Sequence, residues 1–183
     1  MKKSTIFLIV IALLVAVQLW AWSSKHLRST AFTTAAGFKD YHLGTYAVTV
    51  KLPQTTRVVA ETPGSNEMIF SAFLRDETLD FQGYLQLWNI TDLEKFLASS
   101  REHSRFDFKE FKQRKIKLKT CQGFQIDWRA VMQDKKPATG REYFLKKNDS
   151  YEVLRISIFT GTAGFPKELA EVADIIISSI EWK

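Results

Sequence analysis

The chain has 183 residues, of which 26 are Lys or Arg and 20 are Asp or Glu, giving a formal net charge of +6. Hydrophobic residues make up 45% and charged residues 25%, proportions that suit a folded protein and exclude a disordered tail or a collagen-like repeat. The single cysteine excludes an internal disulfide framework and any multi-cysteine zinc or iron–sulfur site, and the three histidines are too scattered for a histidine-rich metal site.

The first 24 residues have the pattern of a membrane anchor. Lys2 and Lys3 precede an apolar run over residues 6–22, which as a helix would be roughly 25 Å long, close to the thickness of a bilayer core. A cleavable signal peptide begins in the same way, but residues 21–23 (AWS) are a poor cleavage site, so the pattern favours an uncleaved signal anchor. The side chains predicted to lie in the bilayer or at its edge include Ile6, Phe7, Leu8, Trp20 and Trp22.

The charges on either side of this apolar run predict how the chain is oriented. Lys2, Lys3 and the α-amino group precede it and Lys25 and Arg28 follow it, and this slight excess favours a cytoplasmic N-terminus. Residues 1–24 are therefore expected to be a single-pass anchor in the cell membrane, residues 25–39 a tether, and residues 40–183 an extracytoplasmic domain. The lone cysteine agrees with export, because spare thiols are liabilities in an oxidising compartment.

Alternation of apolar and polar residues with a period of two predicts a series of strands in this domain. The clearest is 124–132, in which alternate residues from Phe124 to Met132 are apolar and face one way, while Gln125, Asp127 and Arg129 face the other. The last two strands are separated by a short turn and are expected to form a hairpin. The predicted strands are 46–53, Arg57–Glu61, 67–75, 82–89, 112–120, 124–132, 141–147 and 151–160.

Two segments change to a helical period. Residues 91–94 (TDLE) have the form of a capping box with Thr91 as the N-cap, and the helix that follows is predicted to end near Glu102. Pro166 is placed to begin a second, apolar helix that ends near Ile180. Strands joined by hairpins, with helices to cover their faces, predict an α+β fold built on an antiparallel β-sheet covered by helices.

Four segments of the domain form a recognisable series. They are an opening strand that stops at a proline, 46–53; a strand that leads directly into a capped helix, 82–97; a long hairpin, 141–160; and a closing segment, 175–183, in which Ser179 and Ile180 shortly precede Trp182. This series resembles the PsbP-like, or Mog1/PsbP, family, and looks most like its short, membrane-anchored bacterial members. The resemblance covers residues 40–183. It implies an α/β/α sandwich and a role as an accessory or binding module, with no catalytic residues, cofactor or metal.

An enzymatic alternative centres on Cys121. Residues 117–121 (KLKTC) resemble the Thr-Leu-x-Thr-Cys segment of sortases, although the first residue is Lys rather than Thr. A membrane-anchored cysteine transpeptidase or hydrolase of this kind needs a thiol nucleophile, a His as acid or base, and an Arg for the oxyanion. Arg129 follows closely in the sequence, but His42 and His103 have no recognisable surroundings. The favoured interpretation is an inert, buried cysteine at the start of a strand.

Residues 105–119 are a strongly basic segment, with seven cations against two acids and a local charge of +5. Such a surface attracts an acidic protein patch, an anionic lipid or a wall polymer. Lysines on an edge strand also prevent aggregation, and the sequence favours this second role. Nucleic acid is not an expected partner, because export separates the domain from it and Phe106, Phe108 and Phe111 are expected to pack inward. The candidate partner-binding residues are Arg105, Lys109, Lys112, Arg114, Lys115, Lys117 and Lys119.

Taken together, these patterns predict a membrane-anchored, extracytoplasmic accessory module without catalytic activity. Its expected partners are the lipid bilayer, contacted through residues 6–22, and a protein at the membrane surface. Asp76, Glu77 and Asp80 are expected to form a solvated turn, because their spacing matches no calcium-binding loop.

Overall fold

The computed structural model describes residues 37–104, 106–132 and 135–182. The predicted anchor, residues 1–24, and nearly all of the predicted tether lie outside these residues. Among the described residues, no helix is both long and apolar enough to cross a membrane. Nearly all of the described residues belong to one compact unit that starts at Phe38.

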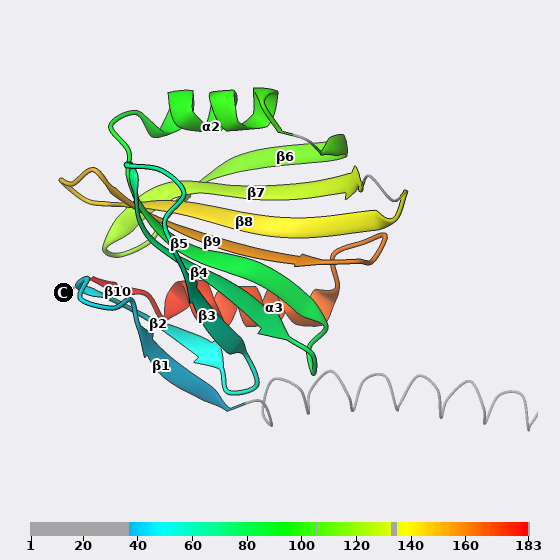
Figure 1. The fold of residues 1–183 in the computed structure, drawn as a ribbon, viewed down its shortest axis with the longest axis horizontal. Helices are drawn as coiled ribbons and strands as arrows, with labels where there is room; N and C mark the ends of the chain where they lie inside the picture. Colours follow the sequence, from blue (N-terminus) through cyan, green and yellow to red (C-terminus); the bar gives the residue numbers. More distant parts are fainter. Residues whose placement is uncertain (1–36, 105, 133–134, 183) are drawn as a thin grey trace, which may run out of the picture. The chain divides into compact units, whose positions relative to one another are not determined.

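A seven-stranded antiparallel sheet forms the centre of this unit (Figure 1). Its strands lie in the order β3-β4-β5-β9-β8-β7-β6, so the hairpin of β8 and β9 lies beside β5, and β3 and β6 are the two edges. Every neighbouring pair is antiparallel. The strands are β3 Arg57–Glu61, β4 Met68–Asp76, β5 Phe81–Asn89, β6 Asp107–Lys117, β7 Cys121–Val131, β8 Pro137–Lys147 and β9 Glu152–Thr160.

Two helices and a smaller sheet cover the two faces, which makes three layers (Figure 1). The helix α2 lies on one face, and α3 lies on the other beside a three-stranded sheet in the order β1-β2-β10. This arrangement confirms the prediction of an antiparallel sheet covered by helices. The bounds are α2 Leu93–Glu102, α3 Lys167–Ser178, β1 Phe38–His42, β2 Val48–Pro53 and β10 Glu181–Trp182.

The predicted strands of the large sheet are confirmed, apart from their ends. β3 has the predicted bounds, whereas β6 begins at Asp107 rather than at residue 112. The sequence does not predict β1 or β10. Both pair with β2, and β10 is only two residues long and lies far from β2 in the sequence. Pairing of this kind leaves no local pattern, because it depends on how the rest of the chain has packed.

Both helices differ from the prediction at one end. The N-cap of α2 is Asp92 rather than Thr91, and its carboxylate accepts a hydrogen bond from the backbone N–H of Lys95 at 3.0 Å. An aspartate here satisfies one of the unpaired amides of the first turn and also stabilises the positive end of the helix dipole. α3 follows Pro166, as predicted, but ends at Ser178, after which the chain extends into β10.

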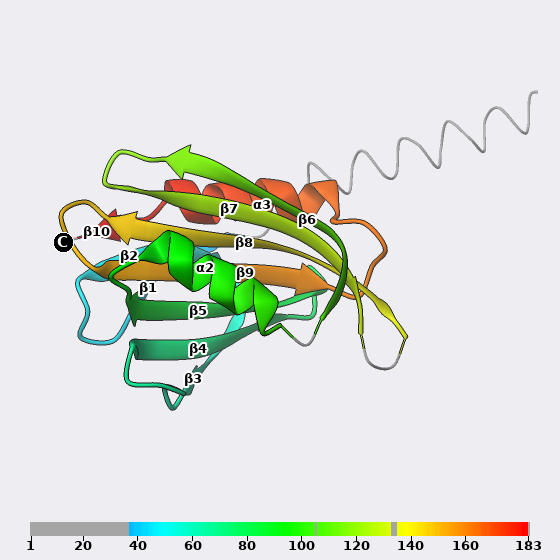
Figure 2. The ribbon, with the colours of Figure 1, turned by 90° about the horizontal axis from the view of Figure 1, so that it is seen from above.

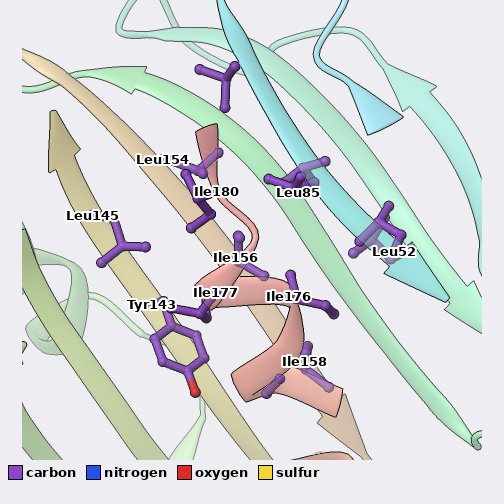
Figure 3. Packing of buried hydrophobic residues seen from close by; sticks show 14 of the residues in the cluster. Leu52, Leu85, Tyr143, Leu145, Leu154, Ile156, Ile158, Ile176, Ile177 and Ile180 are labelled. Atoms are coloured by element: carbon purple, nitrogen blue, oxygen red, sulfur yellow. The ribbon is translucent and has the colours of Figure 1, made fainter. Parts of the chain in front are cut away.

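The face of the sheet under α3 holds the larger core (Figure 3). Leu85 on β5 and Leu154, Ile156 and Ile158 on β9 have no exposed surface. They pack with the apolar residues of α3, which recur every three to four positions and so share one side of the helix. Full burial of each such side chain contributes roughly 1.5–3 kcal/mol, so α3 is the element that closes this core. Its buried residues are Leu169, Val172, Ala173, Ile176 and Ile177.

The helix α2 covers only part of the opposite face, called here the α2 face (Figure 2). Leu93 and Leu97 of α2 form a second core with Phe124 and Ile126 of β7 and Phe144 of β8. In Figure 2, α2 crosses β8, β9 and β5. At the end of the strands where β4 turns into β5 and β7 turns towards β8, no described helix lies over the sheet.

Candidate functional site

A groove lies at this uncovered end of the α2 face. Its volume is about 810 Å³, which is within the usual range for binding pockets. The β4–β5 turn, the end of β9 and the strand ends beside the β7–β8 turn bound it, so segments far apart in the sequence meet here. The apolar residues that line the groove are Phe81, Phe106, Met132, Pro137, Ala138 and Phe159.

Two large apolar side chains are exposed in this groove. Phe106 is 42% exposed and Met132 is 36% exposed. Among the described residues, only Val59 and Tyr151 are other large apolar side chains of comparable exposure, and neither lines the groove. Phe106 is stacked on the buried ring of Trp128, with 5.6 Å between ring centroids and 15° between planes. The prediction that Phe106 packs inward is therefore wrong. An exposed aromatic ring that is supported by a buried one suits a surface that receives a partner.

The position of Trp128 depends on a glycine. Gly140 on β8 pairs with Trp128 on β7. A Cβ atom at Gly140 would lie 2.4 Å from Cζ2 of the indole, which is much closer than two non-bonded carbon atoms can approach. Glycine at this position therefore leaves the space that the indole occupies. The indole in turn packs with the rings of Phe106 and Phe159, with 5.6 Å and 6.4 Å between the centroids.

A largely buried polar network also holds Trp128. The Glu142 carboxylate accepts hydrogen bonds from the indole N–H of Trp128 at 3.0 Å and from Nε of Arg155 at 2.8 Å. Another guanidinium nitrogen of Arg155 donates to the side-chain oxygen of Gln86 at 3.0 Å. The side chains of Glu142 and Arg155 are 14% and 26% exposed, so each charge needs the other to offset its desolvation. The network thereby fixes the indole that supports the groove.

The β4–β5 turn forms a rigid wall of the groove. The prediction of a solvated turn is wrong for Asp76, which is only 1% exposed. Its carboxylate accepts hydrogen bonds from the hydroxyls of Thr55 and Thr56 and from the backbone N–H groups of Thr78 and Leu79, at 2.7–3.0 Å. These four bonds offset the burial of the charge and hold the turn in one conformation. The other two acids of the turn line the groove with Asp76.

The predicted basic segment forms β6, an edge strand. Much of its positive charge is offset by nearby acids. Lys109 pairs with Asp107 at 2.6 Å and Lys112 with Glu110 at 3.6 Å. Lys115 pairs with an acid of α2 at 3.0 Å. Because these lysines are paired with acids, they do not form a continuous positive surface for docking. They fit better with the role of keeping an exposed edge strand soluble.

The other predicted cations have different surroundings. Arg114 donates to the side-chain oxygen of Gln125 at 2.6 Å. Lys117 ends β6 and Lys119 lies in the turn that follows, and neither makes an ion pair with another described residue. Arg105 lies outside the described residues. Among the described lysines of this segment, those without an ion pair are therefore Lys117 and Lys119, at one end of β6.

Cys121 does not have the surroundings of a catalytic thiol. It is 1% exposed, and burial raises the pKa of its thiol above the usual range, which is the opposite of activation. Arg129 lies towards the other end of β7, about 26 Å away along an extended strand. Its guanidinium pairs with Glu110 at 2.7 Å. The nucleophile and the oxyanion arginine of the sortase-like alternative are therefore not brought together.

Each described histidine has a partner of another kind. Nδ1 of His42 lies 2.8 Å from the hydroxyl of Thr49, and Nδ1 of His103 lies 2.9 Å from the carbonyl oxygen of Ser99. Across residues 37–182, leaving out 105, 133 and 134, no group of three or more His, Cys, Asp or Glu side chains is placed to hold a metal ion.

Comparisons with known proteins identify the fold. No protein-family model matches the chain, and no curated protein matches its sequence. PsbP from the cyanobacterium Synechocystis sp. PCC 6803 matches with a TM-score of 0.52 and 10% identity, over 81% of this chain and 94% of that one. The Ran-binding protein Mog1p of Saccharomyces cerevisiae matches with a TM-score of 0.55 and 10% identity, over 80% and 96%. The domain has the Mog1/PsbP-like fold. At this level of identity the likeness shows the fold alone.

The groove is the feature that sequence reasoning does not find. Met132 is expected on the apolar face of its strand, and Phe106 is expected to pack inward. In the structure both are exposed in the groove at the open end of the α2 face. The only local signal is the unusual density of phenylalanine at the start of β6, and it does not distinguish an exposed ring from a buried one.

Proposed function

We propose that the chain is a membrane-anchored binding module without catalytic activity, whose extracytoplasmic domain holds a protein partner in the groove. The observation that carries this proposal is the exposure of Phe106 and Met132 together in one groove. Aromatic and methionine side chains are enriched at the centres of protein interfaces, and a few residues buried at such centres contribute most of the binding energy. A partner that covers them removes apolar surface from water.

The rigidity of the groove supports the same function. The four hydrogen bonds to Asp76 hold one wall, and Glu142 and Gly140 set the position of the indole that supports Phe106. Less conformational entropy is lost on binding when a surface is already ordered. The groove is therefore a better candidate for docking than β6, whose long lysine side chains would have to be immobilised.

The likeness to Mog1p gives general support for protein binding. Mog1p is named as a Ran-binding protein, so at least one protein with this fold binds another protein. The likeness bears on the class of function and not on the identity of the partner, because only the fold is shared at 10% identity.

The membrane anchor and the extracytoplasmic location rest on the sequence of residues 1–24. They are tested by fractionating cells that express the full-length chain. We expect the chain to stay with the membranes through an alkaline carbonate wash, and its C-terminal part to be cleaved by protease added to cells whose outer layers have been removed. Recovery of the intact chain in the soluble cytosol would show that the proposed location is wrong.

Docking in the groove is tested by placing a photo-crosslinking amino acid at Met132 of the full-length chain in its native membranes. We expect a discrete adduct from Met132 that is lost when Phe106→Ala is also present. The same crosslinker at Val59, an equally exposed apolar residue on β3, is the matched control. The proposal fails if both positions give the same adducts, or if Met132 gives none.

A further inference from the structure

Two turns meet at the end of the sheet opposite the groove. The β6–β7 turn and the β8–β9 turn lie side by side in both ribbon views (Figures 1 and 2). A backbone hydrogen bond joins them, since the N–H of Asn148 donates to the carbonyl of Thr120 at 3.4 Å. Residues that are about thirty positions apart in the chain thus form one surface, called here the basic tip. Its basic and exposed aromatic members are Lys117, Lys119, Lys146, Lys147 and Tyr151.

Strand register brings the lysines of the basic tip together. Lys117 on β6 and Lys146 on β8 both pair with Gln122 on β7, so they lie on one side of the sheet, about 10 Å apart across two strand spacings. Lys119 lies in the β6–β7 turn beside them. None of these three makes an ion pair with another described residue.

Acidic residues offset only part of this charge. Lys147 lies 3.9 Å from Glu152 and over the ring of Trp182. Asp149 is exposed in the β8–β9 turn. The basic tip therefore carries four lysines against these two acids.

An exposed aromatic side chain completes the basic tip. Tyr151 is 59% exposed, the most of any large apolar or aromatic side chain among the described residues. The Lys146 ammonium lies 5.2 Å from the centre of its ring. A tyrosine flanked by lysines is the combination found where proteins meet the headgroup region of a bilayer, because the ring prefers the interface and the ammonium groups attract anionic lipids.

We propose that the basic tip docks on the surface of an anionic lipid bilayer. The distribution of charge along β6 separates this role from protection of an edge strand. Lysines that only keep an edge soluble can be placed anywhere along it. On β6, Lys109 and Lys112 are paired with acids of the same strand, whereas the lysines without such partners gather at the end that carries Tyr151.

This proposal is independent of the groove. The basic tip and the groove lie at opposite ends of the large sheet and share no residue. A domain held at one end on lipid leaves the other end free for a protein partner.

The test uses the full-length chain reconstituted in lipid vesicles, with an environment-sensitive NBD dye attached at Asn148→Cys. Asn148 is exposed in the β8–β9 turn, whereas Cys121 is buried and is not expected to be labelled. Because the chain can attach to any vesicle through its apolar segment, the readout is the dye at the basic tip and not vesicle binding. We expect its emission to shift to the blue in vesicles that contain phosphatidylglycerol, not in pure phosphatidylcholine, and to return when salt is added.

Neutralising variants identify the residues responsible. Each of Lys117→Gln, Lys119→Gln and Lys146→Gln should lower the ratio of docked to undocked tips about fivefold. Tyr151→Ser should lower it further at the same charge. The matched control is Lys109→Gln with Lys112→Gln, which removes two ion-paired lysines of the same strand and should leave the ratio unchanged.

Three results would overturn the proposal. The first is a dye that responds equally to both lipid compositions. The second is an equal loss of docking in the control variant, which would indicate a general effect of net charge. The third is the same blue shift on phosphatidylcholine vesicles when soluble polyphosphate is added, which would assign the basic tip to an anionic polymer instead of a bilayer.

Discussion

Replacing Glu142 with leucine should destabilise the domain by about 2–4 kcal/mol. The change removes the acceptor of the Trp128 indole N–H at 3.0 Å and of two Arg155 nitrogens at 2.8 and 2.7 Å. Arg155 then keeps its hydrogen bond to Gln86 and its position over the ring of Phe144, but no acidic partner among the described residues. Breaking one side of a buried ion pair costs about 3–5 kcal/mol, and the lower figure here reflects the partial exposure of both side chains, 14% and 26%.

A double-mutant cycle measures this directly. Glu142→Leu, Arg155→Met and the double variant are compared by urea denaturation of the full-length chain in mild detergent, followed by tryptophan fluorescence. The double variant should be more stable than Glu142→Leu alone, with a coupling energy of about 2 kcal/mol, because no unpaired charge is left behind. Glu67→Gln, at an exposed position just before β4, is the control and should change stability by less than about 0.5 kcal/mol.

Two results would refute the reasoning. If the two single changes add without coupling, the pair contributes no net interaction. If Glu142→Leu changes stability by less than about 0.5 kcal/mol, the network does not hold Trp128, and the groove needs another explanation for its shape. A change in the Met132 crosslink that follows the loss of stability would connect the network to partner binding.

Three further changes test other parts of the structure. Burial raises the pKa of Tyr143 to about 12, from 10 in the unfolded chain, so the stability that the protonated side chain contributes is complete below pH 10 and is lost as the pH rises through 12. Tyr143→Phe should remove this loss of stability at high pH, as measured by denaturation curves at a series of pH values. A loss of the same size in the variant would contradict the assignment to Tyr143. Cys121 should resist iodoacetamide in the folded chain and react only in denaturant, and rapid alkylation of the native protein would revive the enzymatic alternative. Gly140→Ala should lower the free energy of unfolding by about 1–3 kcal/mol, because the added Cβ displaces Trp128, and it should also weaken the Met132 crosslink. The control is Gly164→Ala, whose added Cβ has no atom within 4 Å, and it should change neither the stability nor the crosslink.

Most of the secondary structure could be predicted because its causes are local. Successive side chains of a strand point to opposite faces of the sheet, so a strand with one face in the core shows apolar residues at every second position. This pattern marks residues 124–132, and a short strand could likewise be predicted at Arg57–Glu61. Pro166 marks the start of α3 for an equally local reason, since proline has no amide to satisfy. The choice between Thr91 and Asp92 as the cap of α2 is not local, because both have suitable side chains and only the path of the preceding chain distinguishes them.

The burial of polar residues could not be predicted. Gln125 is predicted to face away from the apolar side chains of its strand, and it is nevertheless only 2% exposed, because α3 and its core cover the second face of the sheet as well. There it accepts a hydrogen bond from Arg114 and donates one to Asp127. Asp76 is buried for a similar reason, since its partners Thr55 and Thr56 come from the segment before β3. In both cases part of the compensation comes from another strand or loop, namely Arg114 of β6 for Gln125 and the segment before β3 for Asp76.

The amino-acid order alone determined that this protein is built on an antiparallel sheet with two covering helices, and its first residues contain the apolar run from which a membrane anchor is predicted. Only the packed structure decided which cations stay without partners, which carboxylates are buried and where Phe106 and Met132 are left uncovered. The physical reason is that periodicity, caps and turns act over a few neighbouring residues, whereas the groove and the basic tip are created where strands far apart in the sequence come into register.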